Sequence, residues 1–151
     1  MNSAARNVAA ENARAAEEFR KRLEGLAFDM DETKARIVNQ AVNVGLANTI
    51  VNTPVGFYLY AKGNTKVGGT LRRRWKKSKT HKEGGAVVGG YANSTSYAVY
   101  VNNGHRIVRN GVTVGLVQGK HMLEIGQRAA EKALPSIYNA EIQRIKRKSG
   151  F

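Results

Sequence analysis

The sequence predicts an α+β protein, in which a small antiparallel sheet packs against a long helix from the N-terminal half and a helix at the C-terminus. Two observations support this class. Apolar residues recur at helical spacing towards both ends of the 151-residue chain, and the stretch between them is rich in glycine and in short apolar runs. Helices, short strands and a last helix therefore follow one another in separate blocks.

Residues 1–28 are rich in alanine, glutamate and arginine, which favour a helix, but large apolar side chains are sparse. The apolar anchors of this stretch are Phe19, Leu23, Leu26 and Phe28. We expect a helical extension that either frays or needs a partner surface, such as a neighbouring subunit.

A second amphipathic helix is expected from about Glu32 to Ile50. Asp29 is its predicted N-cap, because Glu32 follows three residues later in a capping-box pattern. Pro54 ends the helix, since the residue before a proline is biased away from helical geometry. The apolar positions at helical spacing include Ala35, Val38, Val42 and Leu46.

The middle of the chain predicts strands and turns. Residues 57–83 suggest a strand fragment, a flexible loop and a basic segment, and residues 86–104 suggest two short strands around a turn at 93–96. In this interpretation residues 97–101 form a strand under the long helix, and Gly104 permits a turn with positive φ. The Asn110-Gly111 pair is a strong turn signal, so residues 107–118 form a small hairpin or an extended loop.

Helical periodicity returns at residues 119–148, where Pro135 is expected to kink or restart the helix. The basic end of this stretch suits a helix C-terminus. We interpret residues 1–151 as a single domain, with a helical extension at 1–28, a core at 29–135 and a basic C-terminal helix or tail at 136–151.

The composition limits the classes of function. The absence of cysteine excludes disulfides, thiolate metal sites and a cysteine nucleophile, and it fits a reducing compartment. No run approaches the roughly 18 to 20 apolar residues of a membrane span, and no apolar signal core begins the chain. We therefore expect a soluble intracellular protein with no membrane contact. The net charge of +14 indicates a polyanionic partner or an acidic protein surface.

The three histidines, His81, His105 and His121, do not have the spacing of a helical zinc pair. His105 beside Arg106 could act as an acid–base group in phosphodiester chemistry. No motif supplies a partner base or carboxylate, so a turn histidine bonded to the backbone is the preferred interpretation. We predict no metal, no cofactor and no enzymatic activity.

A basic segment around Trp75 is the candidate contact with nucleic acid or with a protein partner. Its cations could bind phosphates while Trp75 stacks on a base. Alternatively, Trp75 anchors the segment in the core or an interface, and the cations face water. The glycine-rich stretches nearby match neither the Walker phosphate-binding motif nor the dinucleotide-binding fingerprint. The candidate cations are Arg72, Arg73, Arg74, Lys76, Lys77, Lys79 and Lys82.

The stretch from His105 to Gln118 is too apolar to be comfortable alone in water. Exposed apolar surface of this kind usually marks an interface, so we expect contact with a neighbouring subunit. The candidate interface residues are His105, Arg106, Ile107, Val108, Val112, Val114, Leu116 and Val117.

Several short motifs occur in order. A helix ends in "TPV", "GTLRRRW" follows, then "YAVYVNNGHR", and "GKHML" opens the last helix. This order resembles the neck, tail-completion and minor tail-component proteins of tailed bacteriophages, which sit at the head–tail junction. The chain differs by a long insertion before "GTLRRRW", by Asn102 and Asn103 where an acidic residue is usual, and by Gln118 in place of a proline. The motif residues are Pro54, Gly69, Leu71, Trp75, Tyr97, Tyr100, Gly104, Gly119 and Met122.

The resemblance implies a small structural subunit of the virion, assembled in the cytoplasm of the host bacterium. It implies a homo-oligomeric ring, either a hexamer or a dodecamer, between the head connector and the tail, with phage connector and tail proteins as neighbours and DNA passing through the channel. The alternative is a basic nucleic-acid-binding protein, or a nuclease that uses His105. The ordered motifs favour the first interpretation, and the net charge alone favours the second.

Overall fold

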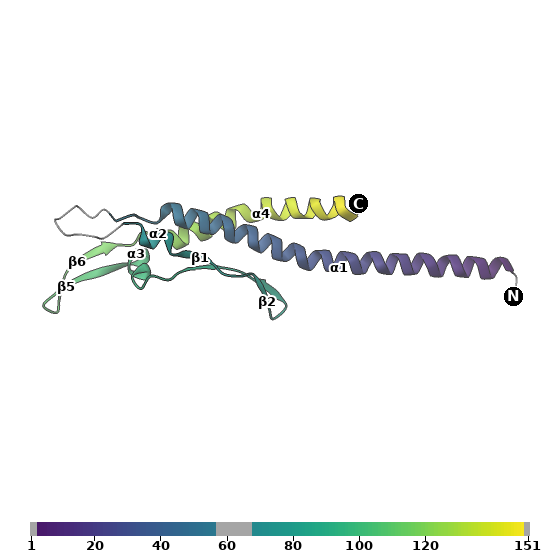
Figure 1. Ribbon diagram of the computed structural model, residues 1–151, viewed down its shortest axis with the longest axis horizontal. Helices are drawn as coiled ribbons and strands as arrows, with labels where there is room; N and C mark the ends of the chain where they lie inside the picture. Colours follow the sequence, from purple (N-terminus) through teal and green to yellow (C-terminus); the bar gives the residue numbers. More distant parts are fainter. Residues whose placement is uncertain (1–2, 57–67, 150–151) are drawn as a thin grey trace.

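The computed structural model describes residues 3–56 and 68–149 and confirms the α+β class (Figure 1). Two long helices, α1 and α4, lie beside a set of short antiparallel strand pairs: β1 with β4, β2 with β3, and β5 with β6. The helices are α1 (Ser3–Asn52), α2 (Thr70–Arg73), α3 (Ala98–Asn103) and α4 (Met122–Ser149). The strands are β1 (Trp75–Lys77), β2 (His81–Glu83), β3 (Ala86–Val88), β4 (Tyr91–Asn93), β5 (Gly104–Arg109) and β6 (Val112–Gln118).

Helix α1 is one continuous helix, so the prediction of a new helix capped by Asp29 is wrong. The acidic residues near this point instead form ion pairs along the surface of the continuous helix. Asp31 pairs with Lys34 at 3.7 Å and Glu32 pairs with Arg36 at 2.6 Å, which are the neighbours that one helical turn brings together. The predicted end is confirmed to within two residues, since α1 stops at Asn52, just before Pro54.

The two long helices run antiparallel and approach closely where two glycines face each other. A Cβ atom on Gly126 would lie 2.5 Å from the carbonyl oxygen of Gly45 and 2.6 Å from the hydroxyl of Tyr91. The Thr49 hydroxyl donates a hydrogen bond of 3.0 Å to that same Tyr91 hydroxyl. The absence of side chains at Gly45 and Gly126 therefore sets the distance between the helices and leaves room for Tyr91 from strand β4.

The core is small and unusually polar. In the described part of the chain, the buried large apolar side chains are Val42, Leu71 and Met122. Hydroxyl, amide and carboxylate groups fill the remaining buried positions, which need hydrogen-bond partners to be stable there. These buried polar residues are Thr33, Thr49, Thr53, Asn102 and Glu141.

Glu141 of α4 ties the helices together a few turns away from the glycine contact. Its carboxylate accepts a hydrogen bond of 2.6 Å from Gln40 and lies 3.3 Å from the Arg36 guanidinium, both on α1. Arg144, one turn along α4, lies 3.4 Å away on the same carboxylate. A carboxylate that is only 7% exposed is thus surrounded by partners from both helices.

The strands β1 to β4 form a two-stranded ribbon along α1. Ser78 and Gly90 join the β1–β4 pair to the β2–β3 pair, because the Ser78 N–H donates to the Gly90 carbonyl at 2.8 Å. Gly84 and Gly85 make the tip with φ values of 55° and 80°, as a two-residue hairpin turn requires. The predicted strand fragment at residue 57 lies outside the described residues.

Two further predictions of local structure are wrong. Residues 98–101 belong to α3 and not to a strand, and Tyr97 is the N-cap of this helix. The helix starts here because Asn93 and Thr95 form a turn, after which the Ala98 N–H donates to the Thr95 carbonyl. The predicted restart at Pro135 does not occur, since α4 continues through this residue. By contrast, the turn at Asn110-Gly111 is confirmed, with φ values of 49° and 79°, and residues 104–118 form a hairpin.

We predict that Gly126→Ala destabilises the protein by about 1 to 3 kcal/mol, because the added methyl group overpacks the contact between α1 and α4. Urea unfolding followed by circular dichroism measures the change. The matched control is Gly25→Ala, where a Cβ atom meets nothing within 4 Å and should instead stabilise the helix by about 0.5 to 1 kcal/mol. Equal effects at the two sites would contradict the proposed role of the glycine contact.

Candidate functional site

Several cations of the basic segment hold the fold together and are not free for a partner. Arg72 donates two hydrogen bonds, of 2.6 and 3.0 Å, to the Thr53 carbonyl at the end of α1. Lys77 donates to the Asn43 side chain at 2.7 Å. Lys82 pairs with Asp31 at 2.7 Å, and this hydrogen bond lowers the pKa of that carboxyl. These contacts tie the ribbon to α1.

The remaining cations of the segment are exposed. The side chains of Arg74, Lys76 and Lys79 make no hydrogen bond or ion pair with the described residues. The exposed Arg73 side chain donates a hydrogen bond of 3.1 Å to the Gly68 carbonyl. The accessible positive surface is therefore narrower than the sequence suggests.

Trp75 has the geometry of an anchor for the ribbon. Its indole N–H donates a hydrogen bond of 2.8 Å to the hydroxyl of Thr53, which is fully buried at the end of α1. Its ring meets the Tyr91 ring edge to face, with centroids 6.0 Å apart. The side chain joins β1, β4 and α1, and its one polar hydrogen is already used.

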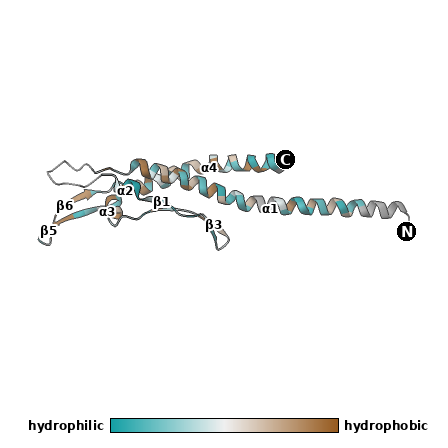
Figure 2. Ribbon diagram, in the orientation of Figure 1, coloured by the Kyte–Doolittle hydropathy of each residue, from teal (hydrophilic) through white to brown (hydrophobic). Residues whose placement is uncertain are grey.

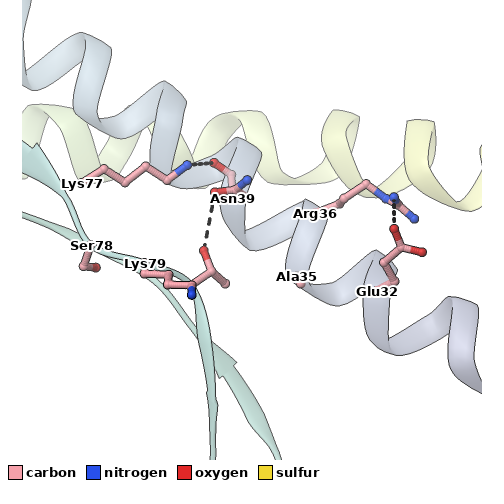
Figure 3. A pocket seen from close by; sticks show the side chains of 8 residues that line it. Glu32, Ala35, Arg36, Asn39, Lys77, Ser78 and Lys79 are labelled. Atoms are coloured by element: carbon pink, nitrogen blue, oxygen red, sulfur yellow. Dashed lines mark hydrogen bonds and ion pairs between the residues drawn. The ribbon is translucent and has the colours of Figure 1, made fainter.

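A groove of about 550 Å³ separates α1 from the ribbon (Figure 3). Lys77 and Thr80 reach across it to Asn39 of α1, at 3.3 and 3.5 Å, and Lys79 lies on its wall. The lone carboxylate on the wall, Glu32, is neutralised by Arg36. The groove is thus weakly cationic, and Lys79 belongs both to its wall and to the exposed cations of the basic segment.

Apolar residues are concentrated in the hairpin of β5 and β6, as the brown sections of its ribbon show (Figure 2). Leu116 is 76% exposed and Val112 is 64% exposed, although both lie within a strand. A two-stranded sheet is marginal by itself in water and normally needs a third strand or a covering helix. The large apolar residues exposed on this hairpin are Ile107, Val108, Val112, Val114, Leu116 and Val117.

The histidines lie apart from acidic clusters. His105 at the base of the hairpin meets the Tyr100 ring of α3 edge to face, with centroids 6.2 Å apart. His81 lies on the ribbon near Glu83, and His121 precedes α4 with a φ of 47°. Within residues 3–56 and 68–149, no three histidine or acidic side chains gather as metal ligands would. No helix in this part of the chain has the length and apolarity that a bilayer crossing requires.

The hairpin is fixed to the body by a corner that the motif residues build. Gly104 has a φ of 83°, which confirms the predicted turn, and a side chain there would collide with the backbone of β6. Gly119 is equally confined, since a Cβ atom would lie 2.6 Å from the carbonyl carbon of Asn103. The two strands of the hairpin can therefore meet at their base only when both positions are glycine.

Asn102 is the residue of this corner that the motifs did not single out for a role. Its side chain is 7% exposed; the carbonyl accepts the Leu123 N–H at 3.0 Å, and the amide donates to the Glu124 carboxylate at 2.9 Å. It thus caps the start of α4 from the end of α3. In the sequence, the one sign of a special role for Asn102 is that an asparagine stands where the phage proteins that the chain resembles usually have an acidic residue.

Glu124 completes the cap. Its own backbone N–H, and to a lesser degree the Asn102 amide, hydrogen-bond to the carboxylate and lower its pKa below the ordinary value of 4.5. A lowered pKa in the folded state stabilises the protein above about pH 4.5, and this contribution disappears as the pH falls through the lowered pKa.

The remaining motif residues are placed around this corner and at the end of α1: Leu71 and Met122 are buried, whereas Tyr97 and Tyr100 are 43% and 57% exposed.

A protein-family model described as "Bacteriophage HK97-gp10, putative tail-component" matches residues 17–104. The match covers more than half of the chain, from the outer part of α1 to the first residue of β5. No curated protein and no solved structure matches the chain significantly.

We predict that Asn102→Ala destabilises the protein by about 1 to 2 kcal/mol at neutral pH, because the start of α4 loses its cap. Glu124→Gln should weaken the dependence of stability on pH below about 4.5, since it removes the group whose pKa the fold lowers. Chemical unfolding at neutral pH and near pH 3 measures both effects. Glu131→Gln, at an exposed position of the same helix, is the control, and a similar change there would contradict the assignment.

Proposed function

The chain belongs to the bacteriophage HK97-gp10 tail-component family, and from this premise we propose that it is a structural subunit of the phage neck. In this role it assembles as a ring that joins the head connector to the tail. The protein then resides in the virion at the head–tail junction, after assembly in the bacterial cytoplasm, and its neighbours are connector and tail proteins. We propose no catalytic role for His105 or any other residue.

The exposed apolar hairpin is the observation on which this proposal depends. A monomer would leave most of the large apolar side chains of β5 and β6 in water, including Leu116 at 76% exposure. Contiguous apolar surface of this kind is characteristic of protein interfaces. A subunit of a larger assembly buries it, which is consistent with a tail-component family.

The basic ribbon supports a second element of the proposal. Arg74, Lys76 and Lys79 lie just before, within and just after β1, and their side chains have no hydrogen-bond or ion-pair partner in the described part of the chain. On a chain with a net charge of +14, these cations suit a surface that faces DNA in the channel or an acidic neighbouring ring. Arg72, Lys77 and Lys82, by contrast, stabilise the subunit itself.

The assembly role predicts a discrete ring, of six or twelve copies, when the purified protein is measured by light scattering at low and moderate salt. A monomer that forms rings only with its phage neighbours would also fit, provided that it ignores duplex DNA at moderate salt. A monomer that binds DNA tightly, and releases it with a slope of about 0.9 per neutralised phosphate as salt is added, would instead support the nucleic-acid-binding alternative.

We predict that replacing Arg74, Lys76 and Lys79 with glutamine impairs particle assembly or DNA retention while the subunit still folds, because these side chains make no hydrogen bond or ion pair with the described residues. Particle yield and packaged DNA are measured after complementation of a phage that lacks the gene. A charge-matched control replaces Arg128, Lys132 and Lys146, which are exposed on α4. Unchanged assembly and DNA retention in the ribbon variant would contradict the role of the ribbon.

A further inference from the structure

The outer part of α1 is an arm that extends past the other described elements (Figure 1), and the Asp31–Lys82 ion pair lies at its base. Helix α4 ends partway along α1, and α1 continues well beyond it (Figure 1). We define the arm as residues 11–31, and every side chain from residue 11 to residue 25 is exposed. An isolated stretch of helix with few large apolar residues gains little stability from its own contacts.

The arm nevertheless has a defined apolar stripe. Phe19, Leu23 and Met30 are 63%, 49% and 40% exposed and follow one another at intervals of four and seven residues, which places them on one side of the helix. The same seven-residue step leads from Met30 to Ile37 and Val44, which are half-buried in the folded part of α1. The stripe therefore continues the inward-facing side of α1 past the end of the body.

The outer face of the hairpin is the matching surface. Arg106 and Leu116 are cross-strand partners, so their side chains share one face. The neighbouring pair, His105 and Val117, belongs to the other face, where the His105 ring meets Tyr100 of α3. The Arg106–Leu116 face is thus the one turned away from α3, and it needs a helix or strand to cover it.

The two surfaces cannot meet within one chain. The hairpin and the free end of α1 lie at opposite ends of the long axis (Figure 1). Their sizes agree, because the stripe from Phe19 to Met30 is about 17 Å long at helical rise and a strand of the length of β5 is about 20 Å long. Two complementary patches at opposite ends of a subunit make a heterologous contact, which joins copies head to tail.

Charge favours the same pairing between copies. The arm, residues 11–31, holds six of the eleven acidic residues and four of the twenty-five basic ones, so it has a net charge of −2 while the rest of the chain has +16. The side chains of Glu11 and Glu18 on the arm make no hydrogen bond or ion pair with the described residues, and neither do those of Arg106 and Arg109 on the hairpin. An acidic arm against a basic hairpin is electrostatically complementary, which favours the correct register.

We propose that the arm of one copy packs its Phe19–Leu23–Met30 stripe on the Arg106–Leu116 face of the β5–β6 hairpin of a second copy. Each contact covers one arm and one hairpin, and its repetition closes the ring or extends the assembly. This inference rests on the proposed assembly role and specifies the contact that forms it.

The absence of native cysteine allows a direct test by disulfide cross-linking. Leu23→Cys and Leu116→Cys chains are mixed, concentrated to the point of assembly and oxidised, and the products are separated by non-reducing electrophoresis. We expect a covalent dimer between the two variants as the dominant product. Lys21→Cys with Leu116→Cys is the control, because Lys21 lies on the opposite side of the arm from Leu23 and should give little dimer.

The outcomes separate the inference from the proposed function. Assembly with no more Leu23–Leu116 cross-link than the Lys21 control would overturn the arm–hairpin contact and leave the neck role intact. A dominant Leu23–Leu23 dimer in assembled material would show that arms pair with arms and would also overturn it. A chain that neither assembles nor enters particles would refute the proposed function itself, and the arm–hairpin contact with it.

Discussion

The close approach of α1 and α4 at Gly45 and Gly126 is the constraint on which the rest of the structure depends. Because neither position carries a side chain, the helix backbones come near enough for the Tyr91 hydroxyl to sit between them and accept a hydrogen bond from Thr49. Tyr91 belongs to the ribbon, so the same contact fixes the ribbon on the helix pair. Packing that depends on small residues tolerates little change in volume.

The small polar core has a consequence for the surface. A chain with 42% hydrophobic residues that fully buries few of them in its described part must leave many exposed. The largest group of them lies on the β5–β6 hairpin at one end of the molecule, and a few, such as Phe19 and Leu23, lie on the arm at the other (Figure 1). Polar contacts such as that of Glu141 with Arg36 and Gln40 hold the body together, while these apolar side chains remain exposed.

Sequence patterns predicted the long helices well because helical periodicity accumulates over many residues. They failed where the structure depends on a few hydrogen bonds. The run Tyr97–Val101 has the composition of a strand, but the turn at Asn93 and Thr95 and the burial of Asn102 make it helical. Asp29 matched a capping pattern, yet no break in helical geometry occurs there, since the neighbouring acids pair along the helix.

The sequence by itself determined the α+β class, the end of α1 before Pro54, the hairpin turn at Asn110-Gly111 and the phage tail-component resemblance, because each depends on local backbone preferences or ordered motifs. Only the tertiary structure decided which cations are free, since Arg72 and Lys77 meet α1 across long stretches of sequence. It also decided that the arm and the hairpin lie at opposite ends (Figure 1). These contacts and positions depend on how the helices and strands pack in space, and no local sequence pattern encodes them.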